Sequence, residues 1–106
     1  MEKKRVAIYS RKENTIEEIR AYVRNHSDWE AVGCYIDNGS SGCDKNRKNL
    51  NQMIDDYDDG KFDIVIVTEM SQLCRSSETL MYIRRRNKEF LESVYCINTE
   101  KFFKLI

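Results

Sequence analysis

The chain has no proline, no low-complexity segment and no linker-like stretch among its 106 residues. Together with this ordinary length, the lack of a dividing segment predicts one domain over residues 1–106. No apolar stretch approaches the ~20 residues that a membrane span needs. The charged amino terminus, Met1 to Arg5, lacks the apolar segment of a secretory signal. We therefore expect a cytoplasmic protein that does not contact a membrane.

An excess of charge is also missing, since 18 lysines and arginines balance 18 aspartates and glutamates. Strong nucleic-acid binders are usually basic, so this balance argues against DNA binding by the chain alone, although local patches can still be basic. Cys34, Cys43, Cys74 and Cys96 form no Cys-x-x-Cys pair, and the one histidine, His26, lies far from them in sequence. These spacings argue against a zinc site, and the missing secretion signal argues against disulfides. Cys34 and Cys96 lie in apolar runs and are interpreted as small core residues.

Apolar strand-like runs alternate with helical patterns along the chain. Strands are predicted at about 5–10, 29–36, 62–67 and 94–97, and the near-continuous β-branched run at 62–67 is typical of a central parallel strand buried on both faces. Helical spacing predicts a helix from Thr15, with a Thr15–Glu18 capping box, to about residue 25. A second helix is predicted from Leu50 until the Asp59-Gly60 pair. A third is predicted from Ser76 or Ser77 to about residue 90.

This alternation predicts an α/β three-layer sandwich with a central, mostly parallel sheet of about four strands. A polar loop is expected at 37–46. The tail, 99–106, holds Phe102, Phe103, Leu105 and Ile106, which would be costly to leave in water. They are expected either to pack back on the sheet or to join a partner.

The first predicted strand ends in Tyr9-Ser10-Arg11-Lys12-Glu13, which places an arginine where open α/β sheets bind ligands. This stretch resembles the Tyr-x-Arg-x-Ser motif that opens the serine recombinases, the resolvase/invertase family. The resemblance extends over most of the chain. The segment 35–42 is similar to the family's acidic, glycine-containing loop, Asn46 to Leu50 to its Asn-Arg-x-x-Leu, and Met70 to Arg75 to its Leu-Asp-Arg-Leu-Gly-Arg. It implies a resolvase-like fold with no metal or cofactor.

The family's last motif residue is a serine that attacks a DNA phosphodiester, but Glu13 stands at that position. A carboxylate cannot form a comparably stable link, and it would repel phosphate by about 4 kcal/mol at ~4 Å in an effective dielectric of ~20. Gln72 also replaces the first arginine of the third motif, where Ser71 and Cys74 are further departures. The resemblance therefore implies a degenerate site. Its remnant phosphate-binding arginines are Arg11, Arg47 and Arg75.

Several of these residues have a plainer interpretation. Ser10 should point to the strand face opposite Arg11, which favours a structural serine over a substitute nucleophile. Ser40 and Ser41 are interpreted as solvated loop residues. Arg47 and Arg75 could simply stand near helix starts. The basic run Arg84-Arg85-Arg86 with Lys88 is either a solvated helix face or, at Arg84, Arg85 and Lys88, a contact to DNA or a partner.

Three functions stay open on the sequence. The first is a recombinase-type domain associated with DNA recombination, inactive by itself and without the dimerisation helix and DNA-binding region that usually follow in the family. The second is a non-catalytic interaction module that pairs with itself or a full-length recombinase through the apolar tail. The third, a binder of a small phosphate ligand, depends only on the sheet crevice and the arginines.

Overall fold

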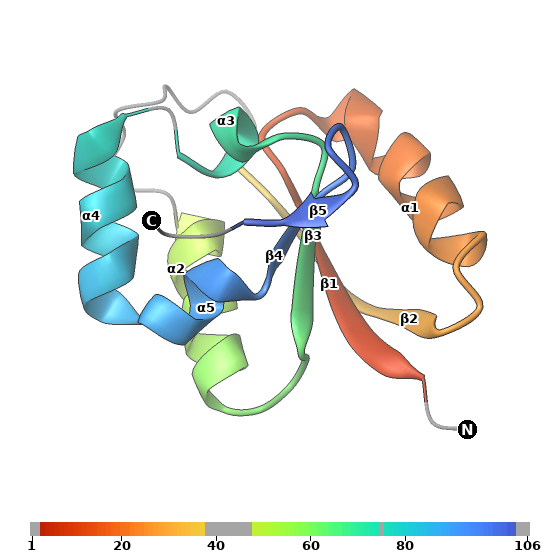
Figure 1. The fold of residues 1–106 in the computed structure, drawn as a ribbon, viewed down its shortest axis with the longest axis horizontal. Helices are drawn as coiled ribbons and strands as arrows, with labels where there is room; N and C mark the ends of the chain where they lie inside the picture. Colours follow the sequence, from red (N-terminus) through yellow and green to blue (C-terminus); the bar gives the residue numbers. More distant parts are fainter. Residues whose placement is uncertain (1–2, 38–47, 75, 104–106) are drawn as a thin grey trace.

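The core of the molecule is a five-stranded sheet in the order β2-β1-β3-β4-β5 (Figure 1). The computed structural model describes residues 3–37, 48–74 and 76–103, with Glu13 described for its backbone only. The strands are β1 (Lys4–Ser10), β2 (Trp29–Ile36), β3 (Ile64–Val67), β4 (Val94–Cys96) and β5 (Lys101–Phe102). The first four pair in parallel and β5 pairs antiparallel with β4. The mostly parallel α/β sheet is confirmed, with one strand more than predicted.

β1 and β3 form the centre of the sheet, with Val6 opposite Ile64 and Ile8 opposite Ile66. All four residues of β3 are buried, and β1 is buried from Val6 to Ser10. This confirms the prediction that the β-branched run is a central strand covered on both faces. Central burial of β1 also fixes where its carboxyl end emerges.

Helices cover both faces of this sheet. The 3₁₀ turn η1 (Glu13–Thr15) leads into α1 (Ile16–Arg24), which among the described helices is the one that covers the first face (Figure 1). There Ile16, Ile19 and Val23 pack on Val6 and Ile8. The other face carries α2 (Lys48–Asp58), α3 (Met70–Leu73), α4 (Ser77–Arg86) and α5 (Lys88–Glu92). The three-layer arrangement is therefore confirmed.

Two helix predictions were wrong in detail. Thr15 precedes α1 as predicted, but its hydroxyl donates to the carbonyl of Lys12 at 2.8 Å and caps no backbone N–H of the helix. The expected helix to residue 90 is interrupted at Asn87, whose extended backbone ends α4 while its side chain accepts from the Phe90 N–H and starts α5. The predicted Ser76 cap of α4 is confirmed, since its hydroxyl accepts from the Thr79 N–H at 3.2 Å.

The tail returns to the sheet as far as the structure describes it. Phe102 stands opposite Tyr95 in the β4–β5 pair, with their ring centroids 5.3 Å apart, and remains 42% exposed. Phe103 donates its N–H to the carbonyl of Val94 at 2.8 Å and packs against the core on the α2 side. Residues 38–46 of the loop predicted at 37–46 lie outside the described residues, and so do Leu105 and Ile106.

Cys96 is buried, as predicted, whereas Cys34 is only partly buried at the edge of the α1-side core. Within the described ranges, no group of three His, Cys, Asp or Glu side chains could hold a metal ion. Among these same residues, no helix is long and apolar enough to cross a membrane.

Candidate functional site at the carboxyl edge of the sheet

The end of β1 is fixed by a compact group of hydrogen bonds. The Ser10 side chain is fully buried. Its hydroxyl lies 2.9 Å from the carbonyl of Lys12 and 2.5 Å from the Thr15 hydroxyl, and it accepts from the Lys12 N–H at 3.0 Å. Both hydroxyls that flank position 13 are therefore engaged in holding the turn. This supports a structural interpretation of Ser10.

Arg11 follows directly and is half-buried. Its backbone N–H donates to Oε1 of Gln72 at 3.2 Å, so the first and third motifs meet at this edge. Gln72 belongs to α3, which the fully buried Leu73 anchors to the core. An arginine carries only hydrogen-bond donors, so this contact depends on the glutamine. The departure from the family pattern thus has a structural role here.

A buried carboxylate joins the ends of β1 and β2 to the start of α2. Asp37, which is 8% exposed, accepts from the Tyr9 hydroxyl at 2.9 Å and from the backbone N–H groups of Asn49 and Leu50 at 3.1 and 3.0 Å. The first turn of a helix has unpaired N–H groups and a partial positive charge, so a carboxylate stabilises it. Sequence reasoning noted the tyrosine and the acidic loop but missed that they bind each other, because they come from different strands.

The ends of β3 and β4 complete the edge with polar side chains. Glu69 accepts from the Ser71 hydroxyl at 2.6 Å and from the Asn98 side-chain amide at 3.3 Å. The Asn98 backbone N–H donates to the carbonyl of Thr68 at 2.9 Å, which ties the two strand ends together. In the described part of this edge, Arg11 therefore lies on the same side of the sheet as hydrogen-bonded carboxylate and amide side chains.

The remaining predicted site residues are not brought together by the described structure. Arg47 and Arg75 lie outside the described residues, and so does the Glu13 side chain. The backbone of Glu13 begins η1, immediately after the Ser10–Lys12 turn. The convergence of the three arginines on one phosphate stays a prediction.

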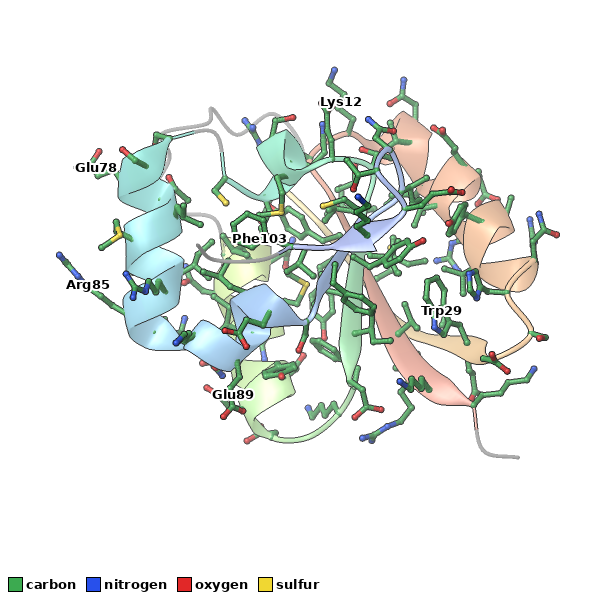
Figure 2. All side chains as sticks on the ribbon, in the orientation of Figure 1. Lys12, Trp29, Glu78, Arg85, Glu89 and Phe103 are labelled. Carbon is green, nitrogen blue, oxygen red and sulfur yellow. The ribbon has the colours of Figure 1, made fainter. Side chains whose placement is uncertain are left out.

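The basic run on α4 faces away from this edge. Arg84, Arg85 and Lys88 are exposed, whereas Arg86 pairs with Asp55 of α2 and donates to Asn51 Oδ1 at 3.0 Å. Figure 2 shows Arg85 projecting from the outer side of α4, well away from Lys12 at the end of β1. The run is thus a separate surface from the Arg11 edge, and one of its arginines serves to pack α4 on α2.

The clearest pKa shifts belong to groups that hold α2 on the sheet. The Tyr35 hydroxyl donates to Asp56 at 2.5 Å, and Asp56 also accepts from Gln52 and from Lys61 Nζ at 3.3 Å. The hydrogen bond from Tyr35, followed by those from Gln52 and Lys61, lowers the pKa of Asp56 despite its burial. Burial and the Asp56 carboxylate raise the pKa of Tyr35 above its ordinary value. Both groups therefore keep their usual charge states at neutral pH and act structurally.

Comparison with protein families matches the resolvase N-terminal domain over residues 5–103. Among solved structures, the N-terminal catalytic domain of TP901-1 integrase is similar to this chain with 27% identity and a TM-score of 0.74, over 92% of this chain and 79% of that one. A search of curated protein sequences finds no match.

Two further solved structures share the fold. A resolvase family site-specific recombinase from Streptococcus pneumoniae has 23% identity and a TM-score of 0.69, over 93% of this chain and 75% of that one. The C-terminal catalytic domain of ISC1926 TnpA, an IS607-like serine recombinase, has 19% identity and a TM-score of 0.68, over 88% and 68% of the two chains. The similarities extend over nearly the whole described chain, so they concern the complete sheet and its helices.

Proposed function

The chain belongs to the resolvase N-terminal domain family, and from this premise we propose that it is a DNA-associated recombinase-type domain that does not cleave DNA strands. Its relatives are named as integrases and site-specific recombinases, which supports an association with DNA recombination. Such a role requires access to DNA, so the proposed location is the cytoplasm. The proposed partners are DNA and a second recombinase subunit, either this chain or a full-length family member.

The observation that carries the proposed loss of cleavage is the state of the hydroxyls around position 13. The residue at that position is a glutamate. Ser10 and Thr15, on either side, hydrogen-bond to each other and to Lys12, and Ser10 is inaccessible. A nucleophile must be exposed to the phosphorus atom that it attacks. Neither neighbouring hydroxyl can therefore replace the missing serine without dismantling the turn.

DNA phosphate is proposed to lie against Arg11, with Arg47 and Arg75 as the other remnant arginines. The hydrogen bond to Gln72 fixes the Arg11 backbone at the carboxyl edge of the sheet, which supports a positioned cation there. Each arginine–phosphate contact adds to affinity and to its salt dependence. The exposed Arg84, Arg85 and Lys88 are proposed as a weaker, separate contact to DNA.

Fluorescence anisotropy with a labelled duplex tests the DNA contact. We expect saturable binding at low salt that weakens as salt rises, and an affinity about five- to tenfold lower for Arg11→Gln. Lys101→Gln is a matched control, since it removes one exposed positive charge from β5, and its effect should stay within about twofold. Absence of saturable binding at low salt would contradict the proposal.

A denaturing gel with labelled duplex tests the loss of cleavage. We expect no covalent adduct from the wild-type chain, because no exposed hydroxyl stands at position 13. Glu13→Ser alone is also expected to give none, since Gln72 carries no charge to stabilise the pentacovalent phosphate. An adduct from the wild-type chain would refute the proposal. An adduct from Glu13→Ser would refute the idea that the missing positive charge at Gln72 prevents cleavage.

The alternative function, a module that pairs through its tail, is the second candidate. Its apolar surface is reduced in the described tail, because β5 pairs with β4 and Phe103 packs on the core. Phe102 remains partly exposed and is the residue that would carry the contact. Light scattering separates the two cases. A concentration-dependent dimer that Phe102→Ser dissociates would favour the module.

A further inference from the structure

A basic hollow lies at the end of the α1 layer opposite to the Arg11 edge. It has a volume of about 320 Å³ and lies between the last turns of α1, the start of β2 and the amino-terminal segment. Figure 2 shows Trp29 at this end of α1, far from Lys12 at the other end. The charged and aromatic side chains that line it are Lys3, Arg20, Arg24, His26, Trp29 and Glu30. None of them belongs to the motifs that define the first site.

The charges around the hollow are predominantly positive. Lys3, Arg20 and Arg24 contribute three positive charges and Glu30 contributes one negative charge, which leaves +2 without counting His26. Among the described residues, no carboxylate lies within ion-pair distance of Lys3 or Arg24, and Arg20 has only Glu17 at 4.0 Å. Like charges four residues apart on a helix destabilise it by a few tenths of a kcal/mol. The pair Arg20 and Arg24 is so placed on α1, and a bound anion would relieve its repulsion.

One wall of the hollow is rigid and aromatic. The His26 ring stacks on the Trp29 indole with centroids 3.7 Å apart and planes 10° apart. The backbone of this turn is fixed, because His26 donates to Val23 O at 3.0 Å and Trp29 donates to His26 O at 3.2 Å. Trp29 itself is 9% exposed and lies against Tyr95. The cations therefore line a hollow whose aromatic wall is held by stacking and by backbone hydrogen bonds.

We propose that this hollow binds a phosphate group, with Arg20, Arg24 and Lys3 as its ligands. Phosphate accepts several charge-assisted hydrogen bonds at once, and guanidinium groups suit it by their paired donors. The net charge of +2 matches a phosphate dianion. The volume lies at the lower limit of small-molecule pockets, so it admits a phosphate with part of the molecule that bears it. The proposal goes beyond the DNA-associated function and does not depend on Arg11.

The single tryptophan of the chain makes the site directly observable, because Trp29 forms its wall. Trp fluorescence is followed while sodium phosphate replaces sodium chloride at constant pH and ionic strength. A parallel ¹H–¹⁵N spectrum follows the Nε–H groups of Arg20 and Arg24. We expect a saturable change with a Kd on the order of 1 mM, and shifts of both arginine signals.

Arg24→Gln is the test variant, and Lys48→Gln at the start of α2 is its control, because Lys48 does not line the hollow and is not among the proposed DNA contacts. Both remove one positive charge from an exposed helical position, and circular dichroism confirms that each folds. We expect the phosphate Kd to rise about tenfold or more in Arg24→Gln and to stay within about twofold in Lys48→Gln. The proposal would be overturned if the two variants lost equal affinity for phosphate. It would also be overturned if neither the fluorescence nor the arginine signals of the wild-type chain changed saturably with phosphate.

Two further probes distinguish the sources of the phosphate. A short unlabelled duplex that competes with inorganic phosphate at Trp29 would identify the site as a contact to the DNA backbone. Adenosine monophosphate that binds more tightly than inorganic phosphate, while the duplex fails to compete, would identify a small phosphorylated ligand. Because the readout is at Trp29 and not at Arg11, this result is independent of duplex binding by the carboxyl edge.

Discussion

Replacing Tyr9 with phenylalanine removes one hydroxyl from the contact that fastens the start of α2 to β1. The ring remains in place, since Tyr9 is fully buried in the core. What is lost is the 2.9 Å hydrogen bond to Asp37, whose carboxylate keeps its bonds to the N–H groups of Asn49 and Leu50. A hydrogen bond to a charged group contributes about 1.5–3 kcal/mol. We expect Tyr9→Phe to lower the free energy of unfolding by about 2 kcal/mol.

The same contact gives a second, linked expectation. Asp37→Asn keeps the side-chain shape but replaces one acceptor oxygen with a donor, which then faces either the Asn49 N–H or both the Tyr9 hydroxyl and the Leu50 N–H. We expect a loss of about 3 kcal/mol, because a buried donor is left unsatisfied in addition to the lost charge. The double variant should lose about 1–2 kcal/mol less than the sum of the single losses, since both act on one network.

Thermal and urea unfolding followed by circular dichroism measure these losses. At this chain length, 1 kcal/mol corresponds to about 4–5 °C in Tm, so Tyr9→Phe should melt about 9 °C lower. Tyr57→Phe is the control, because its hydroxyl bonds a neutral partner, Ser93, at 2.9 Å in a half-exposed position. Its loss should be about 1 kcal/mol or less. An effect of Tyr9→Phe no larger than that of Tyr57→Phe, or additive losses in the double variant, would refute the role assigned to Asp37.

Two further predictions concern the packing of α2 on β2. The pKa of Asp56 is lowered in the folded chain, chiefly by the Tyr35 hydrogen bond, so the stability that this carboxylate contributes is present above its unfolded pKa near 3.8 and is lost as the pH falls through the folded pKa. In urea unfolding from pH 7 to 2, the difference in free energy of unfolding between wild type and Asp56→Asn should therefore shrink below about pH 4. A difference that stays constant with pH would contradict this. A Cβ on Gly33 would lie 3.2 Å from the Tyr35 ring, which the hydrogen bond to Asp56 holds in place. Gly33→Ala should therefore lower the free energy of unfolding by about 1 kcal/mol, and by less in a Tyr35→Phe background. A gain in stability for Gly33→Ala would show that the ring moves freely.

Strands and long helices were predictable because their apolar residues repeat with a period that the sequence displays. β3 is a continuous β-branched run, and α1 has its apolar residues at helical spacing. The elements that were missed are too short for any period: α3 has four residues and β5 has two. The break at Asn87 was also missed, because a helix that ends and restarts on one residue keeps the apolar pattern nearly continuous through the break.

The carboxyl edge of the sheet was predictable as a place, since every parallel strand must end there. Its hydrogen bonds were not, because each joins residues far apart in sequence. The Arg11–Gln72 contact spans 61 positions and the Tyr9–Asp37 contact spans 28. The basic hollow was missed for the same reason. Lys3, Arg20 and Trp29 belong to no common motif, and they come together only because the end of α1 and the start of β2 lie beside the amino-terminal segment in the fold.

The strand order has a consequence for how the chain folds during synthesis. β1 is made first, yet it lies between β2 and β3 and buries both of its faces. The β1–α1–β2 unit is complete by residue 36 and covers the Ile8 face of β1, but the Tyr9 face stays uncovered until α2 and β3 have emerged. Pairings between distant segments slow folding, and transiently exposed apolar strands promote aggregation. We therefore expect a nascent chain stalled before residue 64 to aggregate through the uncovered Tyr9 face of its partial sheet. This tendency to aggregate should fall only when β3 pairs with β1.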